Sequence, residues 1–224
     1  MILSRSQFTP ARRNSFGYGA CLVANVAVVI GCQQGPPPLP LPDFDPSEAG
    51  ARAIELYDTD RDGKIAGEEL ALAPSLKSSL ERFDTDGDRA ISSDEIQARL
   101  QSLLDQKLGY LPVRVQVTLD GDPLEGVEVV FEPEEFLDGT VERASGTTSV
   151  DGETQMAILE ENWPTEDFGI GMQPGFYKVR VSSKAGGSER LPAKYNERTE
   201  LGEELSRDSR VSHRGYVQFD LKSN

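Results

Sequence analysis

Residues 58–69 read DTDRDGKIAGEE, a twelve-residue segment with aspartate at its first, third and fifth positions and glutamate at its twelfth. Gly63, at the sixth position, permits the sharp turn that lets such side chains face inward. Calcium is a hard cation that takes six to eight oxygen ligands, and a short acidic loop closed by a bidentate glutamate supplies them. We therefore predict a calcium site whose ligands are Asp58, Asp60, Asp62, Lys64 through its backbone carbonyl, and Glu69.

A second copy of this pattern follows in residues 84–95, DTDGDRAISSDE, but Arg89 stands at the sixth position. We expect a positive φ there, which costs a residue with a Cβ about 1–2 kcal/mol. Because about 1.4 kcal/mol corresponds to a tenfold change in affinity, Arg89 should weaken calcium binding by the second loop about five- to thirtyfold relative to glycine at this position. The alternative is a loop kept only for packing. The predicted ligands are Asp84, Asp86, Asp88, the Ala90 carbonyl, Ser92 and Glu95.

The flanking residues are typical of helices that enter and leave such loops. Asp45 is a candidate N-cap, followed by a proline and, three residues on, by a glutamate. Leu70 should begin an exit helix that Pro74 cuts short, and Ile65 should pair with Ile91 across the two loops. Together, residues 45–109 resemble an EF-hand pair, more like compact bacterial pairs than four-handed sensors, and this resemblance implies calcium binding.

From Val113 the apolar residues change from a helical spacing to every second residue, as in VRVQVTL, which predicts a strand. Further alternating segments follow, separated by Asp-Gly turns. The phrases DGDPLEGVEVVF, TTSVDGE and MQPGFYKVRV resemble the carboxypeptidase regulatory-like, or transthyretin-like, domain, which implies a seven-stranded sandwich over residues 112–224. The predicted fold class is multidomain α + β: a helical EF-hand pair followed by an all-β immunoglobulin/transthyretin-like sandwich.

The first 31 residues carry three arginines, no acid, and a short apolar run that ends VVIGC. This ending resembles the lipobox of bacterial lipoproteins, which implies a signal peptide over residues 1–31 and lipidation of Cys32. The proline-rich residues 32–44 then read as a tether. A cleaved secretory signal and a retained membrane helix are the alternatives. The predicted location is the cell envelope, with the protein lipid-anchored to a membrane and facing the periplasm or the cell surface.

Composition and motifs narrow the function. The net charge of −15 disfavours nucleic acid as a partner, and both cysteines, Cys21 and Cys32, precede the predicted domains, which excludes thiolate metal sites in them. His213 is the sole histidine, and neither an HExxH nor a G-x-S-x-G motif occurs, so we expect no enzyme. Trp163 could form an aromatic platform for a ligand or cover a sheet edge.

These observations predict a calcium-binding, exported, lipid-anchored protein that acts as a structural or interaction module, with a protein or glycan as the partner of the sandwich. A dockerin-like calcium-dependent adaptor is one alternative. A hydrolase that uses the sandwich loops is the other, because paired carboxylates are abundant in the chain.

Overall fold

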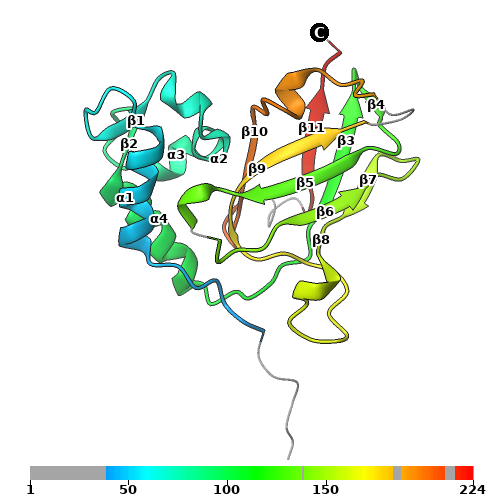
Figure 1. Cartoon of the computed structure of the whole chain (residues 1–224), viewed down its shortest axis with the longest axis horizontal. Coiled ribbons are helices and arrows are strands. Elements are labelled where there is room, and N and C mark those ends of the chain that lie inside the picture. The colour runs from blue at the N-terminus through cyan, green and yellow to red at the C-terminus, as the bar shows by residue number, and fades with distance from the viewer. Residues whose placement is uncertain (1–38, 138, 184–187, 210–214, 224) are drawn as a thin grey trace, which may run out of the picture. The chain divides into compact units, whose positions relative to one another are not determined.

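The computed structural model describes residues 39–137, 139–183, 188–209 and 215–223 (Figure 1). Four α-helices precede the long strands of the chain. They are α1 (Pro46–Tyr57), α2 (Pro74–Ser78), α3 (Leu80–Phe83) and α4 (Ser93–Asp105). A short two-stranded sheet of β1 (Lys64–Ala66) and β2 (Ala90–Ser92) lies among these helices.

The start of α1 follows from its first residues. The Asp45 carboxylate accepts hydrogen bonds from the backbone amides of Ser47 (2.8 Å) and Glu48 (2.9 Å), and Pro46 occupies the first turn. This confirms the predicted N-cap. The buried face of α1 ends at Tyr57, so the chain passes from a core residue directly into the first acidic loop.

The segment between the two loops has less helix than the sequence predicts. A three-residue 3₁₀ turn, Glu69–Ala71, takes the place of an exit helix after the first loop. Pro74 then begins α2 rather than ending a helix, since its missing N–H is tolerated in a first turn. Among the α-helices of the described residues, only α1 and α4, with 12 and 13 residues, are longer than five residues.

Two larger sheets follow. One has the strand order β10-β9-β5-β6-β8, and the other has the order β11-β3-β4 with β7 also paired to β3. The pairs are antiparallel except β11 with β3, which is parallel. The strands are β3 (Arg114–Leu119), β4 (Asp122–Pro123), β5 (Glu128–Pro133), β6 (Ala144–Thr147), β7 (Glu153–Gln155), β8 (Ala157–Ile158), β9 (Gly175–Ser182), β10 (Leu201–Leu205) and β11 (Val217–Leu221).

The first hairpin of these sheets forms where the sequence predicts it. Asp120 and Gly121 both have positive φ, 55° and 100°, as the two central residues of a type I′ turn require. The turn joins β3 to β4, and Val115 and Val117 of β3 are fully buried. The alternation of apolar residues in VRVQVTL therefore predicts correctly that Val115 and Val117 face the core.

The helices and the two larger sheets share one hydrophobic core. Phe83 of α3 packs against Phe176 of β9, with ring centroids 5.0 Å apart, and the Tyr57 ring meets Phe136 edge-on at 6.5 Å. Gly202 of β10 lies so close to α2 that an added Cβ would stand 2.1 Å from the carbonyl carbon of Pro74. The absence of a side chain at this position is what permits the contact.

These findings correct the predicted fold class. The prediction of a multidomain protein with a helical EF-hand pair followed by an all-β immunoglobulin/transthyretin-like sandwich is wrong. Strands predominate in the described part of the chain, which has three sheets and four short helices, and Pro38–Asn224 forms one compact unit. The physical reason is that short helices bury little apolar surface alone, so they pack into the core of the sheets. The limits predicted for residues 45–109 and 112–224 stay predictions.

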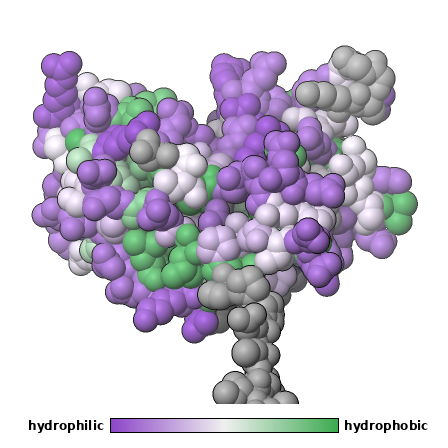
Figure 2. Space-filling model, turned by 60° about the horizontal axis from the view of Figure 1, so that its bottom comes forward, coloured by the Kyte–Doolittle hydropathy of each residue, from purple (hydrophilic) through white to green (hydrophobic). Residues whose placement is uncertain are grey.

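The surface carries the strong charge of the sequence. Figure 2 shows a face that is largely hydrophilic, with its largest apolar area left of the centre. Within the described ranges, no helix has both the length and the apolar character needed to cross a bilayer. The predicted leader, Cys32 and His213 lie outside the described residues.

Candidate metal centre

The two acidic loops lie back to back through the short sheet of β1 and β2. Their antiparallel register pairs Ile65 with Ile91, as predicted, and both isoleucine side chains are fully buried. Strand β1 contacts α1, and β2 contacts α3 and α4, while both isoleucines belong to the hydrophobic core, so the central residues of the loops attach them to that core. The strand pairing therefore fixes the position of each loop relative to the other.

In the first loop, carboxylate oxygens of Asp58, Asp60 and Glu69 lie within 4.8 Å of one another, close enough to hold one metal ion. Asp58 also fixes the turn, because its two oxygens accept from the amides of Arg61 (2.6 Å) and Gly63 (2.9 Å). The loop backbone thus folds around the residue predicted as the first ligand.

Glu69 closes this loop from the other side. One of its oxygens accepts from the Thr59 amide at 2.7 Å, and the other accepts from the Ala66 amide at 3.0 Å. The hydrogen bond from Ala66 is the largest cause that lowers the pKa of Glu69, and those from Thr59 and Asp60 add to it. Glu69 is accordingly held as a carboxylate, the form that binds metal.

Asp62 lies outside the three-carboxylate cluster of the first loop. It is exposed, and one of its oxygens accepts from the Lys64 amide at 2.9 Å. The roles predicted for Asp62 and for the backbone carbonyl of Lys64 stay predictions.

In the second loop, Asp84, Asp86 and Asp88 form the corresponding cluster, again with oxygens within 4.8 Å of one another. Asp84 accepts from the amides of Gly87 (2.7 Å) and Arg89 (2.9 Å), as Asp58 does with the matching residues of the first loop. This repetition shows that Arg89 does not prevent the loop from adopting the turn.

Glu95 lies outside the second cluster, yet it accepts from the same two loop positions as Glu69 does in the first loop, and it also caps α4. Its two oxygens accept from the amides of Thr85 (2.8 Å) and Ser92 (2.9 Å), and the Ser92 hydroxyl accepts from the Glu95 amide (3.3 Å) in a capping box. Burial raises the pKa of Glu95, but these hydrogen bonds outweigh burial and lower it. The predicted ligand roles of Ala90, Ser92 and Glu95 stay predictions.

The backbone confirms the positive φ expected at Arg89, which is 66°. It also shows a second arginine in the same conformation: Arg61, at the fourth position of the first loop, has φ 65°. At the fourth and sixth positions the remaining positive-φ residue of each loop is glycine, Gly63 in the first and Gly87 in the second; the first loop also has Gly67, at its tenth position, with φ 51°. Since the two loops exchange arginine and glycine between these positions, backbone strain does not predict a weaker second loop, which corrects the argument made from Arg89 alone.

Lys64 links the two loops through its side chain. Its ammonium group forms an ion pair with the Asp88 carboxylate and lies 3.9 Å from an Asp86 oxygen. The hydrogen bond to Asp88 is the largest cause that raises the pKa of Lys64, and the same bond is the largest that lowers the pKa of Asp88. The sequence marks Lys64 only as a backbone ligand, so this role of its side chain was missed.

Buried carboxylates tie the helices that flank the loops to the larger sheets. Glu134, after β5, is fully buried and accepts hydrogen bonds from the hydroxyls of Tyr57 and Ser75, both at 2.7 Å. The Lys178 ammonium lies 3.4 Å from the same carboxylate. Glu134 therefore has partners from α1, α2 and β9, which satisfies its charge in the core.

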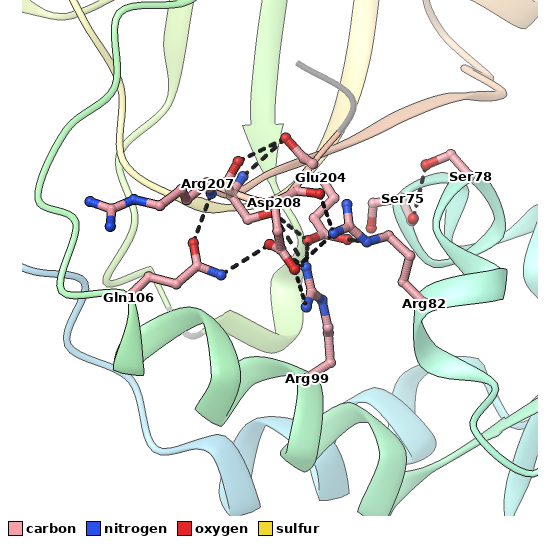
Figure 3. A network of polar contacts seen from close by, with 10 residues as sticks. Ser75, Ser78, Arg82, Arg99, Gln106, Glu204, Arg207 and Asp208 are labelled. Carbon is pink, nitrogen blue, oxygen red and sulfur yellow. Dashed lines mark hydrogen bonds and ion pairs between the residues drawn. The ribbon is translucent and has the colours of Figure 1, made fainter. Parts of the chain in front are cut away.

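A second network joins the helices on both sides of the second loop to β10 and the turn after it. Figure 3 shows Arg82 of α3 and Arg99 of α4 reaching toward Glu204 and Asp208. Arg82 and Arg99 each lie about equally close to the Asp208 carboxylate, at 3.0 Å, and both contact the buried Glu204. Gln106 adds a hydrogen bond to Asp208 at 3.0 Å. Two helices that frame one loop are thus held to the same pair of acids.

Trp163 has a structural position. Its indole N–H donates to the backbone carbonyl of Ile158 in the edge strand β8 (3.3 Å), and its ring packs near Phe168. Of the two interpretations left open by the sequence, the contacts agree with a side chain that covers a sheet edge.

Comparisons of the chain with family models, with curated proteins and with solved structures found no match. The chemistry of the site is therefore inferred from the residues that form it. The two groups, Asp58, Asp60 and Glu69 and then Asp84, Asp86 and Asp88, could hold a metal ion. All their donors are carboxylate oxygens, a set that suits hard cations.

Proposed function

We propose that this protein binds calcium through its two acidic loops. The observation that carries the proposal is the presence of two carboxylate clusters in loops of like backbone that are joined through β1 and β2. Calcium accepts six to eight oxygens in flexible geometry, whereas magnesium demands a near-octahedral shell and retains several waters. A loop with acids at alternate positions offers more oxygens than magnesium uses, which favours calcium. The resemblance of the two loop sequences to EF-hand loops supports the same choice.

The ions would be held chiefly by Asp58, Asp60 and Glu69 in the first loop and by Asp84, Asp86 and Asp88 in the second. Each loop concentrates acids that repel one another without a cation, so a bound ion relieves that repulsion. Calcium should therefore stabilise the loops, and with them the folded chain, by an amount that rises with its concentration.

We propose further that the protein is a structural or interaction module rather than an enzyme. The support is the way in which the loops are attached to the sheets. Tyr57 and Arg82, which precede the two loops, both bond to acids of the sheet region, Glu134 and Glu204. Ordering of the loops by calcium would be passed to the sheets through these contacts, and a protein or glycan that binds the sheets would meet a more rigid surface.

The proposed location is the cell envelope, with a lipid on Cys32. The support is the VVIGC sequence and the proline-rich segment after it. Mass spectrometry of the protein extracted from membranes should find an acylated cysteine at the N-terminus. A mature form that begins at another residue would contradict this part of the proposal.

The calcium proposal is tested by thermal unfolding of the chain in a chelator, in millimolar magnesium and in millimolar calcium. The melting temperature Tm should rise in calcium and rise less in magnesium. Affinity capture of partners with and without calcium then tests the interaction role, because a calcium-dependent module should retain its partner only in calcium. Equal Tm values in all three buffers would contradict calcium binding.

A further inference from the structure

Lys64 belongs to one loop by its backbone and to the other by its side chain. Its amide donates to Asp62 in the first loop, and the residue pairs with Ser92 across the short sheet. Its ammonium group forms an ion pair with Asp88 and lies 3.9 Å from Asp86, the fifth and third positions of the second loop. The strand pairing places the Lys64 backbone opposite Ser92, within side-chain reach of the second loop.

The arrangement is not reciprocal. The residue of the second loop that corresponds to Lys64 is Ala90, whose side chain carries no charge to return to the first loop. The second loop thus holds a cation of the protein itself beside two of its three clustered carboxylates, and the first loop receives none from its counterpart. Because each loop has one arginine at positive φ, backbone strain does not separate the two loops, whereas this cation does.

We propose that Lys64 is a tethered cation that competes with calcium for the second loop and so makes this loop the weaker of the two sites. The inference rests on the proposed function, because it concerns the affinity of the same loops. One oxygen of Asp88 accepts from the Ala90 amide at 2.8 Å and the other contacts Lys64, so a metal ion must share this carboxylate with the ammonium group.

The size of the effect follows from the charges. A doubly charged ion bound near an ammonium group is repelled, but Lys64 and Asp88 are both more than a third exposed, so water and salt screen the repulsion. We expect removal of the charge to tighten the second site by about three- to tenfold at low salt. The effect should shrink as the salt concentration rises.

The same contact has the opposite effect when metal is absent. The ammonium group then offsets repulsion among the acids of the second loop, so its removal should lower the Tm in a chelator. If Lys64 only packed against the loop, its replacement would lower the stability of the protein both without metal and with calcium bound. If Lys64 competes with calcium, its replacement should lower the stability of the protein without calcium and raise the affinity of the second loop for calcium. These opposite effects identify the proposed role.

The experiment is calorimetric calcium titration of the full chain at low salt, together with Tm in a chelator. The variants are Lys64→Met, Lys64→Gln as a second neutral replacement, and Lys64→Arg, which keeps the charge. Lys77→Met, at an exposed lysine of α2, removes the same charge elsewhere. Both neutral variants of Lys64 should tighten the weaker class and lower the Tm without metal, while Lys64→Arg and Lys77→Met should leave the weaker class near its parent affinity.

Asp86→Asn and Asp88→Asn, at carboxylates of the second cluster, assign the weaker class to the second loop, and Lys64→Met should have no effect on the class that remains in an Asp88→Asn background. If the parent shows two classes and both neutral variants leave the weaker one unchanged or weaken it, the inference is overturned while calcium binding stands. If the parent binds no calcium, the proposed function fails, and the inference fails with it.

Discussion

The hydroxyl of Tyr57 donates a 2.7 Å hydrogen bond to the buried carboxylate of Glu134. Tyr57 is the last residue of α1 and directly precedes Asp58, whereas Glu134 follows β5. Burial is the largest cause that raises the pKa of Tyr57, and the Glu134 charge adds to it, so the hydroxyl keeps its proton and remains a donor. This bond fixes the start of the first loop to the sheets.

Tyr57→Phe should therefore destabilise the protein while leaving its fold unchanged. The lost bond is to a charged group and leaves part of Glu134 unsatisfied, which costs about 1.5–3 kcal/mol. Urea unfolding measures the loss, and Tyr216→Phe, at a partly exposed tyrosine, serves as the control and should change the free energy of unfolding by less than about 0.5 kcal/mol. Equal losses in the two variants would show that the bond to Glu134 contributes nothing.

Asp208 should make stability depend on pH in the acid range. Burial raises the pKa of Asp208, but hydrogen bonds from Arg99 and Ser206 and the charges of Arg99 and Arg82 lower it well below its usual range. A carboxyl whose pKa is lower in the folded state stabilises above its unfolded pKa, about 3.9, and loses this contribution as the pH falls toward its folded pKa.

The measurement is Tm against pH for the parent, Asp208→Asn and the control Asp151→Asn, at an exposed turn residue. Asp208→Asn should be clearly less stable than the parent near pH 6, and the difference should narrow below about pH 4. A difference that stays constant from pH 6 to pH 3 would mean that the charge of Asp208 is not what stabilises this network.

Gly202→Ala tests the contact between α2 and β10. An added Cβ would lie 2.1 Å from the carbonyl carbon of Pro74 and 2.2 Å from the Ser75 nitrogen, so backbone must move. Overpacking of this kind costs about 1–3 kcal/mol or more. Gly175→Ala is the matched control, because its Cβ would meet neighbours at 3.4–3.5 Å, which is ordinary contact. Chemical unfolding should give a much lower free energy of unfolding for Gly202→Ala than for Gly175→Ala. The reverse order would contradict the packing described.

The exchanged arginines make a paired prediction. Arg61→Gly and Arg89→Gly should each raise the free energy of unfolding in calcium by about 1 kcal/mol, because glycine accepts positive φ without a Cβ penalty. Arg61→Ala and Arg89→Ala remove the same charges but keep the Cβ, so they should gain less. If alanine and glycine stabilise equally, the gain comes from charge rather than from the backbone.

The sequence predicts the loops well because their geometry is local. The alternating acids, the pairing of Ile65 with Ile91 and the positive φ of Arg89 all follow from positions within one or both loops. The positive φ of Arg61 is not indicated by its own residue type, but glycine at the matching position of the second loop, Gly87, does indicate it.

The contacts that join the loops to the sheets could not be predicted in the same way. Glu134 stands in a run of acids, residues 132–135 reading EPEE, and nothing local shows that it alone is fully buried. Its partners Tyr57 and Ser75 are far away in the chain, so only the tertiary packing selects it. The same packing explains why the predicted fold class was wrong.

Calorimetric titration of the full chain with calcium, in the parent and in Glu69→Gln and Asp88→Asn, tests calcium binding by the two loops most directly. The parent should bind two ions, with the weaker site near or above the range of about 10⁻⁴ to 10⁻³ M that is typical of extracellular calcium modules. Glu69→Gln should remove the tighter site, and Asp88→Asn should remove the weaker one. Binding that neither substitution alters, or no binding at millimolar calcium, would contradict the assignment of these loops as calcium sites.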